Sequence, residues 1–374
     1  MALAATDGPI VDVPALDPFK EWVNWLSQPK ISLTFFTILF VLMMVWYRKW
    51  TKPFVALGLL LGFCVFYFGS MVIDHDYYLI LTKPDNVPIT IMLLGTGFCL
   101  WLAFRQAAIN DERIKAGQPL IEEGKDDKVL VWPDLVYTEM ICMVLATAAL
   151  FIWSGLVGAP LESPANPAGP PNPSKAPWYF LGLQEMLVYF DPWMAGVLLP
   201  GMIITGLIAM PYIDVNPKGN GYYTIRERPF AITTWMFGFI ILWMVLIVFG
   251  TFLRGPNWNF FGPYAYWDSH LQVPLTNINL SEYFWVLTLD QPLPENPVVR
   301  ECAGLAFTFF WVVLLPVLLA KTVMRRLYDQ MGPMRFYIMA IHFVIMAMLP
   351  VKMVLRWLFT LKYFVYLPEY NLNL

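Results

Sequence analysis

Long apolar runs constrain this 374-residue sequence more than any other feature. Hydrophobic residues make up 58% of the chain and charged residues only 14%, and the charges fall in clusters between the apolar runs. About 20 apolar residues cross the hydrocarbon core of a bilayer as a helix, and an isolated segment in lipid can satisfy its backbone hydrogen bonds only in that form. The sequence therefore predicts an all-α, polytopic transmembrane protein with about eight spans. The predicted spans are residues 31–47, 53–73, 88–104, 136–159, 193–213, 231–253, 303–323 and 336–355.

The basic residues predict how the chain is oriented in the membrane. Most of the 24 lysines and arginines lie in every second connection between the spans, and such connections face the cytoplasm. We therefore expect both the N-terminus and the loop around Trp178 on the periplasmic side of a bacterial inner membrane. Lys352, Arg356 and Lys362 depart from this pattern. A last helix that ends early and lies along the interface, with its lysines snorkelling, would explain them.

The distribution of motifs and charges divides the chain into four parts. Residues 1–110 hold three spans and no motif, and residues 111–131 form a charged cytoplasmic connector. Residues 132–260 carry the motifs described next, and residues 261–374 comprise a periplasmic loop and two C-terminal spans. The motif-bearing part includes a proline-rich stretch, residues 158–174, that reads as a stiff, extended lead into the Trp178 loop.

Short motifs stand at successive helix ends of the third part. Ala176-Pro-Trp-Tyr179 opens a short amphipathic surface helix after Pro177. The others are Trp132-Pro-Asp-Leu-Val-Tyr137, Pro211-Tyr-Ile-Asp-Val-Asn-Pro217, Arg228-Pro-Phe and Arg254-Gly-Pro-Asn-Trp258. In this order and spacing they resemble the C-terminal half of cytochrome b, also called subunit IV. The resemblance covers about a third of the chain, from Trp132 to Trp258.

This resemblance implies a membrane subunit of a Rieske/cytochrome b-type quinol:cytochrome c oxidoreductase, similar to complex III of a respiratory chain. Such complexes couple quinol oxidation to electron transport and proton translocation, and this subunit alone would be inactive. Pro177, Trp178, Tyr179 and Phe180 would contribute to the outer quinol-oxidation site. Asp134, which takes the place of a family aspartate, would lie on the inner quinone side.

One departure from the family pattern changes the expected chemistry. The glutamate that is thought to accept a quinol proton in the family falls at Pro177 here. Glu185 lies seven residues beyond Trp178, so the two share a face if the segment is helical. We therefore predict Glu185 as the substitute proton acceptor, with Tyr179 as a second catalytic candidate. Two structural alternatives are a solvated Glu185 on the polar helix face and an aromatic segment that only anchors the interface.

The histidine count restricts the cofactors. The two b haems of a cytochrome b need four imidazoles, and the chain has three histidines. The chain is therefore expected to bind no haem by itself. For His342, the single intramembrane histidine, we expect a hydrogen bond to a neighbouring helix in preference to a haem or quinone contact. The four cysteines lack metal or disulfide spacing, so no metal site is expected in this chain.

The resemblance also implies the partners. These are a di-haem subunit similar to the N-terminal half of cytochrome b, a Rieske protein with a 2Fe–2S cluster and a c-type cytochrome. The complex would be dimeric and surrounded by lipid. This chain and its partners would share a quinone site, and no nucleic acid is expected to bind. Two other functions stay open: a quinone-binding anchor of a non-Rieske oxidoreductase, and a transporter. A transporter would place charged residues at the bilayer midplane, where these spans have almost none.

Overall fold

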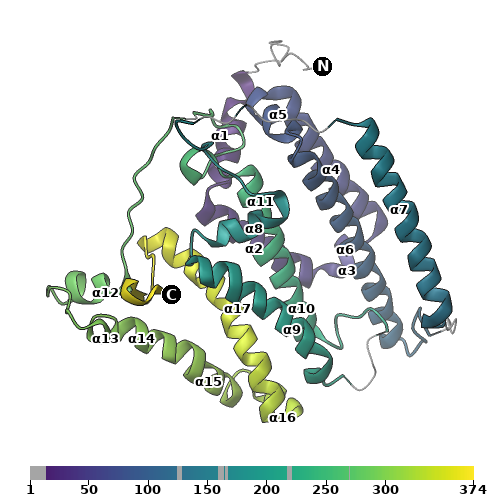
Figure 1. Ribbon diagram of the computed structural model, residues 1–374. Coiled ribbons are helices and arrows are strands. Elements are labelled where there is room, and N and C mark those ends of the chain that lie inside the picture. Colours follow the sequence, from purple (N-terminus) through teal and green to yellow (C-terminus); the bar gives the residue numbers. More distant parts are fainter. Residues whose placement is uncertain (1–13, 124–128, 159–163, 165–166, 217–220, 269) are drawn as a thin grey trace.

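The computed structural model describes residues 14–123, 129–158, 164, 167–216, 221–268 and 270–374 (Figure 1). Helices dominate the described part of the chain, and its strands are β1 (Tyr366–Leu367) and β2 (Leu372–Asn373), which pair antiparallel. The predicted all-α fold is therefore confirmed. The predicted short helix after Pro177 is α8 (Trp178–Met186).

Seven helices of the described chain are long and apolar enough to cross a membrane. Five are α4 (Pro53–Ile73), α6 (Asn86–Lys115), the Val131–Leu156 helix containing α7 (Val136–Leu156), the Met194–Ile213 helix containing α9 (Leu199–Ile213), and α17 (Pro333–Phe359). The other two are Pro229–Phe252, which joins α10 (Pro229–Met236) to α11 (Val245–Phe252), and Cys302–Lys321, which joins α14 (Cys302–Phe309) to α15 (Leu315–Lys321). The shorter helices are α3 (Tyr47–Trp50), α5 (His75–Thr82), α12 (Leu280–Glu282), α13 (Pro297–Arg300) and α16 (Arg325–Met331).

The first predicted span, residues 31–47, corresponds to α2 (Pro29–Val45), and a sharp bend joins this helix to the one before it. Helix α1 (Asp17–Leu26) and the short turn before it meet α2 at 82°, and this pair raises the number of candidate spans to eight. Pro29 explains the break, because proline fixes the residue before it in an extended conformation and starts a new helix. Gln28 has that extended backbone.

The last span differs from the prediction that it ends early and lets its lysines reach the membrane interface. Helix α17 continues to Phe359, and Lys352 lies inside it with a side chain that is 0% exposed. Its Nζ stands 4.0 Å from the centre of the Phe364 ring. The prediction that this lysine snorkels from an early helix end to the interface is therefore wrong, because the C-terminal segment folds back over α17 and covers it.

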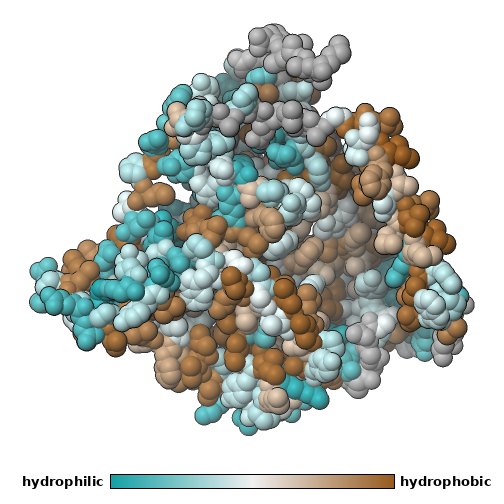
Figure 2. All heavy atoms as spheres, viewed as in Figure 1, coloured by the Kyte–Doolittle hydropathy of each residue, from teal (hydrophilic) through white to brown (hydrophobic). Residues whose placement is uncertain are grey.

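The helices pack around α11, α8 and α17, and α7 stands at one edge of the molecule, at the right of Figure 1. The main core cluster brings together Phe40 of α2, Met186 of α8, Leu199 of α9, Leu246 of α11 and Met353 of α17. Helix α7 buries no residue within the chain, and Figure 2 shows apolar side chains exposed along it. Such a surface suits contact with lipid or with another membrane subunit.

A buried aspartate ties the N-terminal spans to the rest of the chain. Asp111 of α6 is 1% exposed and accepts hydrogen bonds from the Tyr47 hydroxyl at 2.7 Å, the Thr224 hydroxyl at 2.5 Å and the Ile225 N–H at 3.2 Å. A carboxylate in water-poor surroundings is stable only when its oxygens are bonded in this way. The segment before α10 is therefore fixed against α6 and α3.

Candidate functional site

Helix α8 is fixed closely against α11 at the Trp178 end of the molecule. Two glycines permit the approach: a Cβ on Gly250 would lie 3.0 Å from the Leu181 oxygen, and one on Gly182 would lie 3.3 Å from Ile247 Cγ1. Gln184 also holds the preceding loop, because its side chain accepts from the Ala176 N–H at 2.8 Å and donates to the Ser174 oxygen at 2.8 Å. The loop and the helix therefore form one ordered unit.

A buried ion pair lies between α8 and the segment that follows α11. Arg254 donates to Glu185 twice, from Nε to Oε2 at 2.8 Å and from Nη2 to Oε1 at 2.5 Å, and the Tyr189 hydroxyl donates to Oε1 at 2.8 Å. Glu185 is 0% exposed. Bidentate pairing of arginine with a carboxylate combines charge with a fixed geometry, so these contacts set how α8 sits on α11.

The surroundings of Arg254 are arranged to keep it charged. Its Nη1 donates to the Trp258 oxygen at 2.6 Å, and its guanidinium lies 4.1 Å from the centre of the Phe260 ring. Burial lowers the pKa of Arg254, but the Glu185 carboxylate more than offsets this effect, so the pKa is raised overall. Burial also raises the pKa of Tyr189, and the negative charge of Glu185 raises it further, so the tyrosine remains a hydrogen-bond donor.

Three aromatic residues at the start of α8 form a surface that we call the aromatic ledge: Trp178, Tyr179 and Phe180. The Trp178 and Tyr179 rings meet edge to face at 5.5 Å, and the Tyr179 and Phe180 rings are 4.7 Å apart. Tyr179 is 50% exposed and Phe180 is 51% exposed. The ledge is therefore open to a ligand, to lipid or to a partner subunit.

The structure brings some of the predicted site residues together and separates others. Pro177 adjoins the ledge, whereas Glu185 faces Arg254 and Tyr189 on the buried side of α8. The alternative of a solvated Glu185 is wrong, because its side chain is fully buried. Among the described residues, no hydrogen bond joins Glu185 to the ledge. Asp134 is exposed in the turn before α7, about 30 Å of helix away from the α8 loop.

Sequence reasoning did not find the partners of Glu185. Arg254 lies just beyond the helix pair Pro229–Phe252 and is part of a helix-end motif, but its pairing depends on how α8 packs against α11. Tyr189 lies one helical turn beyond Glu185 on the same side, and this i, i+4 spacing was the available signal. Its hydroxyl makes the contact only because the backbone remains turned beyond the end of α8.

Lys175 is a second titratable group beside this ion pair. Its Nζ donates to the Thr251 oxygen of α11 at 2.8 Å. Burial, together with the positive charges of Lys83 and Arg254, lowers the pKa of Lys175 to about 8, although the negative charge of Glu185 opposes the shift. The loop before α8 therefore carries an amine that changes its charge near neutral pH.

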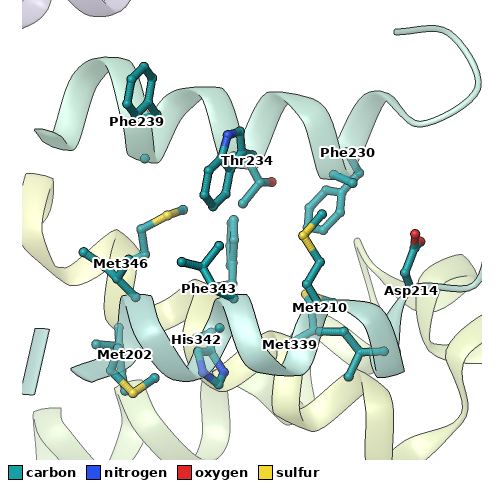
Figure 3. Close-up of a pocket in the computed structure, with 18 of the residues that line it drawn as sticks. Met202, Met210, Asp214, Phe230, Thr234, Phe239, Met339, His342, Phe343 and Met346 are labelled. Atoms are coloured by element: carbon teal, nitrogen blue, oxygen red, sulfur yellow. The ribbon is translucent and has the colours of Figure 1, made fainter. Parts of the chain in front are cut away.

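A cavity of about 1110 Å³ opens between α9, the α10–α11 span and α17. Figure 3 shows Phe239 and Met202 toward one end and Asp214 and Phe230 toward the other. His342 of α17 lies in the wall, and its Nε2 is 3.1 Å from the Thr205 hydroxyl of α9. The expected hydrogen bond from His342 to a neighbouring helix is confirmed.

The histidines of the chain do not fit the ligation of two b haems. That arrangement needs four imidazoles in facing pairs, and the three histidines occupy separate places. His75 begins α5 and stacks on Tyr78, His270 lies in the loop after Asp268, and His342 lies within α17. The described residues also form no group of three metal-ligating side chains. We derive no reaction step through haem in this chain.

Residues 164–266 match the family described as cytochrome b (C-terminal)/b6/petD. The match covers roughly a quarter of the chain and includes α8, α9, α10, α11 and both members of the Glu185–Arg254 pair. It confirms the resemblance that the helix-end motifs indicated, although it stops short of the Trp132–Tyr137 motif. No solved structure matches the chain. The matched region is thus similar to the C-terminal half of cytochrome b, and the long apolar helices indicate an integral membrane protein.

The buried ion pair predicts a measurable coupling. Glu185→Gln and Arg254→Gln should each lower the free energy of unfolding by about 3–5 kcal/mol, because each leaves an uncompensated buried partner. The double variant should cost clearly less than the sum, since the penalty of the orphaned charge disappears. Denaturant unfolding of the detergent-solubilised protein measures this, with the exposed Glu112→Gln as control. Additive losses, or losses no larger than in the control, would refute the coupling.

Lys175 predicts a pH dependence of stability. Between pH 8 and the ordinary lysine pKa of about 10.4, the unfolded chain binds more protons at this residue than the folded chain does, so its contribution to stability rises with pH. Lys175→Met removes that contribution. The difference in unfolding free energy, wild type minus variant, should therefore increase from pH 8 to pH 10 and be flat below pH 7. Lys30→Met, at an exposed side chain, corrects for the loss of one charge, and a flat difference throughout would count against the shifted pKa.

Proposed function

We propose that this chain is a haem-free membrane subunit of a Rieske/cytochrome b-type quinol:cytochrome c oxidoreductase, and that the aromatic ledge forms part of its outer quinol-oxidation site. The observation that carries the proposal is the placement of an exposed aromatic ledge on a helix fixed by a buried ion pair, within the segment that matches the cytochrome b C-terminal family. The complex, not this chain alone, is the enzyme.

The ledge has the physical properties that a quinol ring needs. Half-exposed aromatic faces offer stacking contact to a flat ring, while Pro177 limits the backbone motion of the loop. Glu185 and Arg254 hold α8 from its buried side, so the ledge keeps its position when a ligand arrives or leaves. A site held in this way binds with a smaller loss of conformational entropy.

Glu185 is the proposed proton acceptor, and the structure adds a condition to that role. Oε1 accepts from both Tyr189 and Arg254, whereas Oε2 accepts from Arg254 Nε and from no other donor among the described residues. A carboxylate oxygen has two lone pairs, so Oε2 can accept one more hydrogen bond. Because the carboxylate is fully buried, the quinol proton would reach it through a bridging water molecule. Tyr179 on the ledge is the second candidate.

The remaining parts of the reaction belong to partners in this proposal. A di-haem cytochrome b-type subunit and a Rieske protein receive the two electrons of the quinol, and a c-type cytochrome accepts electrons from the Rieske cluster. The Trp178 end faces the periplasm of a bacterial inner membrane, and Asp134 lies on the inner quinone side. The exposed apolar surface of α7 supports assembly with another membrane subunit, and the assembly is dimeric.

The ledge predicts the effect of one substitution. Tyr179→Ala removes a stacking surface and a candidate proton group, so quinol oxidation by the assembled complex should slow at least tenfold, about 1.4 kcal/mol in activation free energy. Steady-state reduction of a c-type cytochrome measures the rate. Tyr212→Ala, at an exposed tyrosine near the end of α9, is the matched control. Unchanged turnover of a fully assembled Tyr179→Ala complex would favour an aromatic segment that only anchors the interface.

A further inference from the structure

The cavity between α9, the α10–α11 span and α17 has the size and lining of a ligand site. Its volume of about 1110 Å³ slightly exceeds the range of about 300–1,000 Å³ that is usual for small-molecule pockets. Apolar side chains and methionines form most of its wall, with Met202 and Met210 from α9 and Met339 and Met346 from α17 (Figure 3). Methionine side chains adapt their shape to a ligand. A long, flexible, apolar molecule therefore fits this wall.

His342 contributes a hydrogen-bond acceptor to the cavity wall. Its Nδ1 is 2.7 Å from the Ile338 oxygen, and a carbonyl oxygen can only accept, so Nδ1 carries the proton. In the neutral imidazole, Nε2 then carries a lone pair. The Thr205 hydroxyl faces both Nε2, at 3.1 Å, and the Gly201 oxygen, at 2.9 Å. It also lies 3.3 Å from the Met202 oxygen, so it can give its single proton to a backbone oxygen when a ligand hydroxyl donates to Nε2.

The space around this imidazole is also shaped for it. A Cβ on Gly206 of α9 would lie 3.3 Å from His342 Cδ2, closer than most real contacts of a Cβ. The glycine therefore lets α9 and α17 approach with the imidazole between them. The histidine lies about 13 Å along α17 from its first residue, Pro333, well inside the span.

The charges at the Asp214 end of the cavity select against an anionic head group. Asp214 and Glu227 line this end together with Arg228, which pairs with Asp214. Glu227 accepts a hydrogen bond from the Tyr222 hydroxyl. The Arg228 guanidinium therefore already has a carboxylate partner, and a phosphate would have to compete with Asp214 for it. The site therefore favours a neutral ligand over a phospholipid.

We propose that this cavity binds a quinol molecule, with one ring hydroxyl donating to His342 Nε2 and the isoprenoid tail along the methionine-rich wall. This site is separate from the aromatic ledge, and it would hold a second quinol of the complex. The reduced form is preferred because a quinone carbonyl is an acceptor and cannot bond to the lone pair of Nε2. The choice of quinol among neutral hydroxyl-bearing lipids rests on the proposed function.

The test uses the assembled complex and a benzoquinone probe with a ten-carbon tail that carries a diazirine, held either oxidised or reduced during illumination. Peptide mapping then locates the labelled residues. We expect the reduced probe to label α9 and α17 at least fivefold more than the oxidised probe. His342→Phe should abolish that preference, whereas His342→Gln, whose amide oxygen also accepts, should restore it.

A second variant and a competing lipid distinguish the possible outcomes of this experiment. If His342→Phe fails to assemble, Ala231→Phe, which fills the cavity from α10, should remove cavity labelling by both forms of the probe. Equal labelling by both redox forms, or competition by a long-chain diacylglycerol as strong as that by quinol, would overturn the quinol assignment. Labelling confined to the ledge peptides would overturn the cavity site and leave the proposed function intact. Labelling of the cavity without the ledge would count against the proposed function instead.

Discussion

The position of α8 depends on the bidentate contact between Glu185 and Arg254. Removing two charges from water costs several kcal/mol per ion, and an imperfect geometry would leave that cost uncompensated. Here the Tyr189 hydroxyl and the Trp258 oxygen make further hydrogen bonds with the pair, and the Phe260 ring covers the guanidinium. The contact therefore forms only when α8, α11 and the segment after α11 are all in place. It fixes the direction in which the aromatic ledge faces.

The parts of the chain outside the matched segment complete its surroundings. Asp111 of α6 binds the Thr224–Ile225 backbone and side chain just before α10, so the N-terminal spans hold the start of that helix. Helix α17 supplies His342 and one wall of the cavity beside α9. Gly206 lets α9 and α17 approach each other with the His342 imidazole between them. The additional spans thus shape a site that the matched segment lacks by itself.

The spans and the short helix after Pro177 could be predicted because hydropathy, helix length and proline are local properties. The bend at Gln28–Pro29 has a local signal too, but the signal gives no angle. Two features could not be predicted. Glu185 and Arg254 are 69 residues apart, and no periodicity relates them. The sequence predicts Lys352 at the membrane interface, whereas in the structure the folded-back segment around Phe364 covers it. Both depend on packing between distant segments, which single-sequence patterns do not encode.

The central claim is that this chain shapes a quinol site while its partners carry the redox centres. The most direct measurement is affinity purification of the complex through a tag on this chain, followed by a reduced-minus-oxidised absorption spectrum and separation of the subunits with haem staining. The account predicts b-type absorbance and haem stain on a co-purifying polypeptide, and none on this chain. Two b haems retained by this chain alone, or a purified complex with no b-type subunit, would contradict it.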